Sequence, residues 1–176
     1  MQPSQPFSIR PATPADCEPI VGLIRELAEF ERLSHLVVVT PESLCTHLFG
    51  PRPAAEAVVA EREGGGEGGG EGEGGVIAFA LYFTNFSTFL GRPGLYLEDL
   101  YVQPAHRGQG LGQALLRHLA RLAVQRGCGR FEWSVLDWNA NAIGLYEKMG
   151  ATVMPDWRIC RVTGPALQAL GSPQGG

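Results

Sequence analysis

The sequence from Leu97 to Gly112, LEDLYVQPAHRGQGLG, decides the fold of this chain. Its apolar beginning predicts a strand that carries two carboxylates, and its glycine-rich end opens a predicted helix. A strand, a glycine loop and a helix start together gather unpaired backbone N–H groups at the positive end of the helix dipole. The stretch therefore predicts a binding site for a phosphate group.

The two carboxylates in this strand, Glu98 and Asp99, are adjacent in the sequence. Adjacent side chains on a regular strand point to opposite faces of the sheet. We therefore expect one carboxylate to face a substrate cleft and the other to brace the structure.

Length and composition limit the class of protein. The chain has 176 residues and a formal net charge of −4, which predicts one domain over 1–176 and offers no basic stripe for nucleic acid. It has no apolar run of the roughly 18 residues that cross a bilayer and no signal-peptide pattern at its start. We expect a cytoplasmic protein without nucleic-acid or membrane partners.

The four cysteines lie far apart in the sequence, with no pair at metal-ligand spacing. This spacing predicts isolated reduced thiols in packing roles, and neither a disulfide framework nor a zinc site.

The remaining pattern predicts a mixed α/β fold in which one sheet is covered by helices. Strands are expected at 7–10, 57–62, 76–86, 96–102, 130–136 and 157–162, and helices at 14–31, 41–49, 111–126 and 139–149. The tract at 63–75 contains only Gly and Glu and is expected to be a disordered hairpin loop, and the tail at 171–176 is expected to be flexible.

The glycine loop itself narrows the kind of phosphate site. It lacks the Lys-Ser/Thr of a Walker loop, and it does not fit well a dinucleotide fingerprint, which places its glycines near the first strand and an acid about twenty residues on. Arg107 precedes Gly110 and Gly112 in an Arg-x-x-Gly-x-Gly pattern. This pattern resembles the acetyl-CoA pyrophosphate loop of GCN5-related N-acetyltransferases (GNAT).

Further motifs are similar to the diamine and polyamine branch of that family. They are Arg10-Pro11-Ala12-Thr13, Ile24-Arg25-Glu26-Leu27-Ala28, Leu97-Glu98-Asp99, Leu136-Asp137-Trp138-Asn139 and Leu145-Tyr146. The Leu-Asp-Trp-Asn form most resembles the thialysine-acetylating members. The resemblance implies a GNAT-type fold, with a central, mostly antiparallel sheet flanked by helices, and it also implies a homodimer.

The resemblance also implies a set of residues that bind acetyl-CoA, with no metal. The backbone of Leu100, Tyr101 and Val102 would pair with the pantetheine arm. The pyrophosphate would be held by Arg107, Gly108, Gln109, Gly110, Leu111, Gly112 and Gln113, and the same cofactor would be lined by Asn139, Ala140, Asn141 and Ala142.

Catalytic and acceptor residues follow from the same resemblance. Tyr146 matches the general acid that protonates the departing thiolate, although from the residues alone it could be a core aromatic. Glu98 matches the group that takes the substrate's ammonium, directly or through water. The resemblance also implies substrate-binding positions at Phe30, Glu31, Glu132, Trp133, Ser134 and Asp137. From the residues alone, Phe30 and Glu31 could be an exposed helix end and 132–134 an ordinary strand. Asp137 could simply bond to the backbone.

These expectations lead to an acetyl-CoA-dependent N-acetyltransferase of a small diamine, polyamine or thialysine-like amino acid. A free amine is protonated near neutral pH, so the enzyme must supply a base before direct transfer. A peptide or protein acceptor and a non-catalytic acetyl-CoA sensor are the alternatives.

Overall fold

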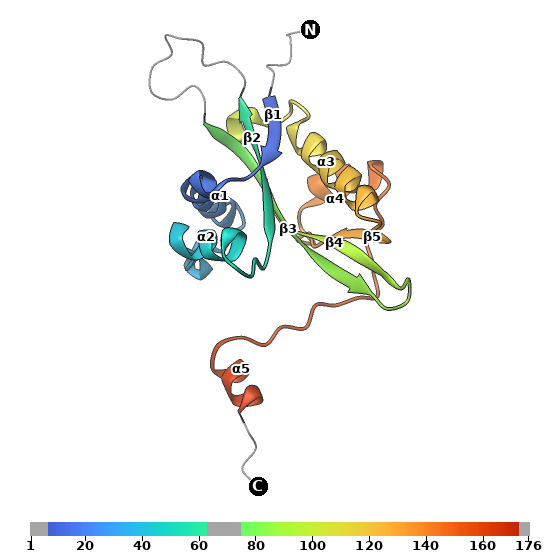
Figure 1. Ribbon diagram of the computed structural model, residues 1–176. Helices are drawn as coiled ribbons and strands as arrows, with labels where there is room; N and C mark the ends of the chain where they lie inside the picture. Colours follow the sequence, from blue (N-terminus) through green and yellow to red (C-terminus); the bar gives the residue numbers. More distant parts are fainter. Residues whose placement is uncertain (1–6, 63–74, 173–176) are drawn as a thin grey trace. The chain divides into compact units, whose positions relative to one another are not determined.

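The computed structural model describes residues 7–62 and 75–172 of the chain (Figure 1). Of the predicted Gly/Glu loop, 63–74 lies outside the described residues, as does 173–176 of the predicted tail. The chain divides into two compact units, Met1–Ser134 and Val135–Gly176, and each is described by itself. The single domain over 1–176 stays a prediction.

The first unit is built on a five-stranded sheet, which contains five of the six predicted strands. The strands are β1 (Phe7–Pro11), β2 (Glu56–Arg62), β3 (Val76–Ser87), β4 (Arg92–Val102) and β5 (Arg130–Trp133). They lie in the order β1-β2-β3-β4-β5. The pairs β1–β2, β2–β3 and β3–β4 are antiparallel, and β5 runs parallel to β4. The predicted mixed, mostly antiparallel sheet is therefore confirmed.

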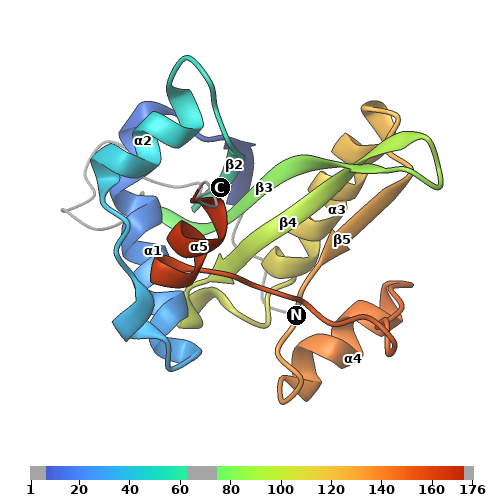
Figure 2. The same cartoon turned by 90° about the horizontal axis from the view of Figure 1, so that it is seen from below.

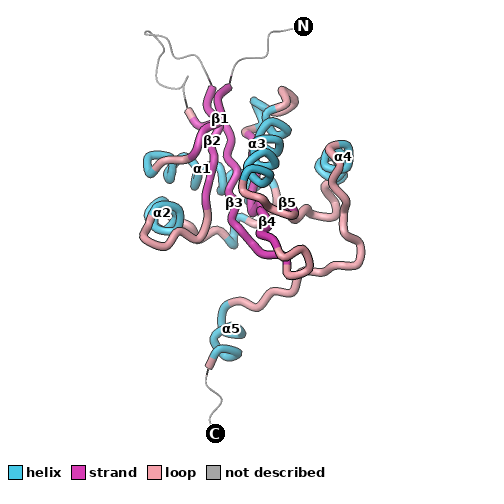
Figure 3. The backbone as a smooth tube through the Cα atoms, turned by 45° about the vertical axis from the view of Figure 1, so that its right-hand side comes forward, coloured by secondary structure: helices cyan, strands magenta, loops and turns pink. Residues whose placement is uncertain are grey.

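Helices cover both faces of this sheet. On one face lie α1 (Cys17–Phe30) and α2 (Pro41–Phe49), and on the other lies α3 (Leu111–Gln125), as Figures 1 and 3 show. Their bounds agree closely with the sequence-based helices. Short 3₁₀ turns precede α1 at Pro14–Asp16, precede α2 at Ser34–Leu36 and precede α3 at Pro104–His106.

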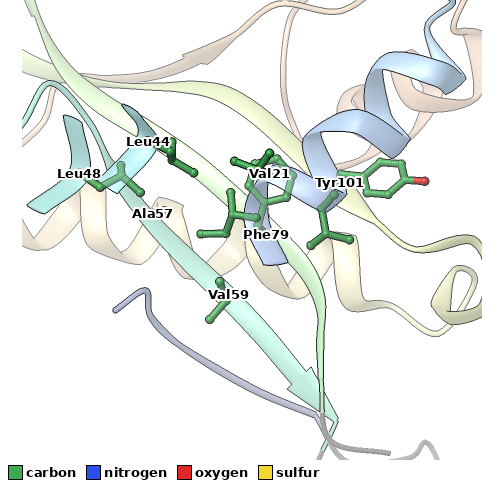
Figure 4. Close-up of a cluster of buried hydrophobic side chains, with 9 residues drawn as sticks. Val21, Leu44, Leu48, Ala57, Val59, Phe79 and Tyr101 are labelled. Carbon is green, nitrogen blue, oxygen red and sulfur yellow. The ribbon is translucent and has the colours of Figure 1, made fainter. Parts of the chain in front are cut away.

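Two apolar layers form because strand residues alternate between the faces. Toward α1 and α2, a buried cluster joins side chains of both helices to β2, β3 and β4 (Figure 4). It comprises Ile20, Val21, Leu23, Leu44, Leu48, Ala57, Val59, Phe79 and Tyr101. On α3, the buried stripe is Leu111, Leu115, Leu116, Leu119 and Ala123.

A disulfide between Cys17 and Cys45 joins α1 to α2, with their Cα atoms 5.7 Å apart. The prediction of four reduced thiols is therefore wrong for this pair. Distance along the sequence misled it, because α2 packs Leu44 and Leu48 into the same core as α1 and so brings Cys45 against the first residue of α1. Cys128 and Cys160 are free thiols, as predicted.

The second unit contains α4 (Ala140–Lys148) and α5 (Gly164–Gly171), both visible in Figure 2. The predicted helix at 139–149 is confirmed. The predicted strand at 157–162 is wrong, since those residues form no regular element and Trp157 and Ile159 are exposed. A strand also needs a partner edge to pair with, and in the described part of the chain no strand pairs with this segment.

One further boundary and one further helix differ from the predictions. The strand expected at 130–136 ends at Trp133, and α5 was not expected at all. Among the residues that the structure describes, no helix is both long and apolar enough to traverse a bilayer.

Candidate active site

A β-bulge in β4 places Glu98 and Asp99 on the same face of the sheet. In the β3–β4 register Leu81 pairs with Asp99 and Tyr82 pairs with Leu97, so Glu98 is an extra residue without an opposite partner. Counting in twos from Tyr101, which belongs to the core under α1, puts Asp99 on the α1 face.

Leu97, on the other side of the bulge, shows which face of the sheet Glu98 occupies. Leu97 pairs with Tyr82, which lies on the α3 face because it is three residues after Phe79. The residue after Leu97, Glu98, therefore faces α1 as well. The expectation that the two carboxylates point to opposite faces is wrong, because alternation reverses at a bulge.

The electrostatics agree with this geometry. Burial, together with the smaller effects of the charges of Glu98 and Glu31, raises the pKa of Asp99 to about 6. Burial also raises the pKa of Glu31, the residue that follows α1. Three carboxylates therefore meet where the end of α1 faces the bulge of β4. Such a cluster attracts an ammonium group and includes one acid that changes charge near neutral pH.

Beyond the bulge, one edge of β4 has no strand beside it. The last β4–β5 pair is Leu97 with Trp133, whereas β4 continues to Val102. In the described part of the chain no other strand pairs with this edge. The backbone of Leu100 to Val102 on this edge thus has no strand partner in the described residues, and its pairing with a pantetheine arm stays a prediction.

The glycine loop leads directly into α3. Gly108 and Gly110 have positive φ angles of 73° and 83°, and a Cβ atom at either position would meet nothing within 4 Å. No side chain caps the helix at Gly110. The first turn of α3 therefore offers backbone N–H groups to an anion beside an open loop, and these residues fit the pyrophosphate of acetyl-CoA.

Arg107 uses its side chain within the protein. Its Nε atom donates a hydrogen bond to the carbonyl oxygen of Val102 at 2.9 Å. Its Cζ atom lies 5.2 Å from the centre of the Phe30 ring and 5.2 Å from that of the Tyr101 ring. These contacts link the glycine loop to α1 and to β4, a connection that sequence analysis missed because it joins residues distant in the chain.

The β5 residues predicted to bind substrate have partners inside the first unit. Glu132 accepts a hydrogen bond from Asn85 at 3.2 Å and forms an ion pair with Arg130 at 2.9 Å. The hydroxyl groups of Ser134 and Tyr96 lie 2.8 Å apart. The Trp133 ring packs at a tilt on Phe131. Because Arg130 offsets the charge of Glu132, this carboxylate attracts an amine less than the cluster at Glu98 does.

The second unit holds the other predicted site residues. The Oδ1 atom of Asn139 accepts a hydrogen bond from the Ala142 amide at 3.2 Å, which caps α4. Asp137 is exposed. Tyr146 lies within α4, and burial raises its pKa. Its phenol therefore stays protonated near neutral pH, which is the state that a general acid needs. The cofactor and catalytic roles of these residues stay predictions.

Comparison with known proteins identifies the family. Residues 26–151 match the model of the acetyltransferase (GNAT) family. A thialysine N-epsilon-acetyltransferase of Mus musculus is 42% identical over 166 residues, which cover 92% of this chain and 95% of the mouse protein. The L-ornithine N5-acetyltransferase NATA1 of Arabidopsis thaliana is 36% identical over 197 residues, covering 92% of this chain and 86% of that protein.

A solved structure supports the fold independently of these sequence matches. The integron cassette protein VCH_CASS6 from the mobile metagenome of V. cholerae superimposes with a TM-score of 0.73 at 24% identity, over 93% of this chain and 96% of its own. The family match and the relatives both cover the bulge of β4, the glycine loop and α4. The chain therefore belongs to the GNAT family and is an N-acetyltransferase.

Proposed function

We propose that this protein transfers the acetyl group of acetyl-CoA to a primary amine of a small diamine, a polyamine or a thialysine-like amino acid. One observation carries the proposal, namely that Glu31, Glu98 and Asp99 concentrate negative charge on the face of β4 whose edge is open beyond Leu97. The names of the mouse and Arabidopsis relatives, which specify thialysine and ornithine, support an acceptor of this size.

The first task of the site is to bind and deprotonate the acceptor. A primary aliphatic amine is protonated at neutral pH and has no lone pair for attack. The carboxylate cluster attracts the ammonium group, and Glu98, whose side chain is exposed, removes a proton directly or through a water. Asp99 lies more deeply in the same cluster. Its carboxylate attracts the cationic acceptor, and the positive charge of the acceptor offsets the negative charge of Asp99.

The second task is group transfer within one ternary complex. Acetyl-CoA supplies the activated thioester. A backbone N–H of β4 polarises the thioester carbonyl as the amine nitrogen forms its bond to the acetyl carbon and the carbon–sulfur bond breaks. Tyr146 donates its phenolic proton to the departing thiolate, and no covalent enzyme intermediate is required.

A panel of acceptors tests this proposal. Purified protein with acetyl-CoA is offered putrescine, spermidine, thialysine, ornithine and a lysine peptide, and CoA release is measured with the acetylated product. We expect transfer to one or more of the small amines. Glu98→Gln should lower kcat by roughly 10²-fold, whereas Glu29→Gln, an exposed acid on α1, should leave it unchanged.

Two outcomes would contradict the proposal. Acetylation of the peptide without any small amine would indicate a protein acceptor. Calorimetric binding of acetyl-CoA without transfer to any member of the panel would indicate a non-catalytic sensor.

A further inference from the structure

We propose that Arg107 is a positioning residue that couples the glycine loop to Phe30, and that this coupling makes acceptor affinity depend on the order of the loop. The inference rests on the proposed function for its acceptor but on contacts within the first unit for its mechanism. It assigns to the Arg107 side chain a role other than binding the pyrophosphate.

The hydrogen bond at Arg107 fixes the direction of its side chain. Nε, the donor nearest the aliphatic stem, is bonded to the carbonyl oxygen of Val102, the last residue of β4. The guanidinium group is thereby held back against the strand that precedes the loop. Because the group is planar and rigid, fixing Nε also fixes the orientation of the other N–H donors.

The two aromatic contacts then tie three elements together. Phe30 is the last residue of α1, Tyr101 lies in β4, and Arg107 stands immediately before Gly108. A guanidinium group within about 6 Å of a ring centre is attracted to the ring face, and both rings here are at 5.2 Å. The loop therefore cannot change the position of Arg107 without disturbing Phe30.

A second contact links α1 to the end of β4. Gln103 donates a hydrogen bond from Nε2 to Glu26 on α1 at 3.1 Å. The charge of Glu26 and burial both raise the pKa of Tyr101, whereas the charge of Arg107 opposes them. The Gln103–Glu26 bond thus links α1 to the end of β4, and the glycine loop that follows Arg107 carries two positive-φ glycines.

Phe30 is well placed to convert this coupling into acceptor affinity. Its side chain is 46% exposed although it contacts Arg107, and the next residue, Glu31, belongs to the carboxylate cluster. When acetyl-CoA orders the glycine loop, Arg107 holds Phe30 and the end of α1 in one position. The amine then meets a preformed surface, and by linkage a bound amine tightens the loop in return.

Hydrogen exchange on the free protein tests the coupling without any activity measurement. Phe30→Leu keeps an apolar side chain but removes the ring, and we expect it to speed exchange of the hydrogen-bonded amides at the two ends of the loop, those of His106, Arg107 and Ala114, by about fivefold. Phe49→Leu is the matched control, because Phe49 is the last residue of α2 and is 40% exposed. Unchanged exchange in the loop of the Phe30→Leu protein would overturn the proposal, whatever the enzyme acetylates.

Kinetics test the consequence for the acceptor. Arg107→Lys keeps the charge but loses the Nε bond and the planar face, so at saturating acetyl-CoA it should raise the KM for the amine by about fivefold. In the Phe30→Leu background the same change should have no further effect. Arg117→Lys, an exposed arginine on α3, should leave both constants unchanged.

The same variants separate positioning from phosphate binding. A positioning residue leaves the calorimetric Kd for acetyl-CoA within about twofold of the wild-type value, whereas loss of the bidentate contacts of a phosphate ligand weakens binding about tenfold or more. A raised Kd combined with additive effects of Arg107→Lys and Phe30→Leu on the amine KM would overturn the proposal. If loop exchange responds but no amine is acetylated, the coupling stands and the proposed function fails.

Discussion

Glu98 and Asp99 are adjacent in β4 and yet face the same side of the sheet, because the strand bulges at Glu98. Their proximity has a thermodynamic cost. The charge of Glu98, together with burial and the charge of Glu31, makes it harder to ionise Asp99 in the folded protein than in the unfolded chain. A protein keeps such a pair where the charge is used for binding or proton transfer.

Replacing Asp99 should therefore stabilise the protein in a pH-dependent way. The pKa of Asp99 is raised from its ordinary value of 3.8 to about 6, so the folded state binds the proton more tightly and stability falls as pH rises through this interval. Asp99→Asn removes the penalty, which amounts to about 3 kcal/mol when the group is fully ionised.

Urea unfolding of the wild-type and Asp99→Asn proteins checks the direction of this pH dependence. The difference in unfolding free energy between Asp99→Asn and wild type should grow from about pH 4 to about pH 7 and stay constant above that. The exposed Asp156→Asn serves as the control. A difference that is the same at both ends of the range would show that Asp99 ionises normally in the folded protein.

Local sequence patterns predicted the fold of the first unit well, because its elements carry their own start and stop signals. Thr40 followed by Pro41 marks the beginning of α2, and runs rich in valine, aromatic and other apolar residues mark β2 and β3. The disulfide between Cys17 and Cys45 and the irregular 157–162 segment were not predictable in this way. Both depend on which segments meet in space, and single-sequence patterns do not contain that information.

The disulfide should contribute measurably to stability. It closes a loop with a sequence separation of 28, for which the chain-entropy model gives about 3 to 4 kcal/mol. Cys45→Ser should lower the unfolding free energy by about this amount. Dithiothreitol should destabilise the wild type similarly and leave Cys45→Ser unaffected.

Cys160→Ser is the control for this experiment, because Cys160 is an exposed free thiol. A thiol titration of the unreduced protein under denaturing conditions gives a second readout. Two reactive thiols would agree with the structure, and four would contradict it.

Gly110 should be required for both the loop and the cofactor. Its φ angle of 83° is one that residues with a Cβ atom rarely adopt, so Gly110→Ala should cost about 1 kcal/mol of stability. Because relieving this strain moves the first N–H groups of α3, the variant should also raise the KM for acetyl-CoA.

The contrasting glycine is Gly22 in the middle of α1, where a Cβ atom would meet nothing within 4 Å. Gly22→Ala should stabilise the protein by about 0.5 to 1 kcal/mol, because alanine favours the helix. Differential scanning calorimetry and acetyl-CoA titration measure both effects. Equal behaviour of the two alanine variants would show that the backbone at Gly110 is not constrained.

The candidate site was only partly predictable, for a reason that lies in β4. Sequence patterns located Glu98 and the glycine loop, since each is a local motif. The bulge was not apparent, so the participation of Asp99 was missed. The position of Arg107 against Phe30 was missed for the same reason as the disulfide, because their contact spans most of the first unit.

Tyr146 provides the sharpest test of the proposed chemistry. Burial raises the pKa of its phenol above the usual value near 10, so the group stays protonated throughout the assay range. Tyr146→Phe keeps the ring in α4 and removes only the proton donor, so kcat should fall by roughly 10²-fold while the KM for acetyl-CoA changes little.

The loss should be smaller with an acyl donor whose thiol has a lower pKa, because such a leaving group needs less protonation. Tyr82→Phe is the matched control, since Tyr82 is buried and lies on the α3 face of β3, away from the carboxylate cluster. Equal turnover of Tyr146→Phe and wild type would remove this phenol from the mechanism. The thiolate would then take its proton from solvent, and the catalytic advantage of the site would rest on the carboxylates of β4.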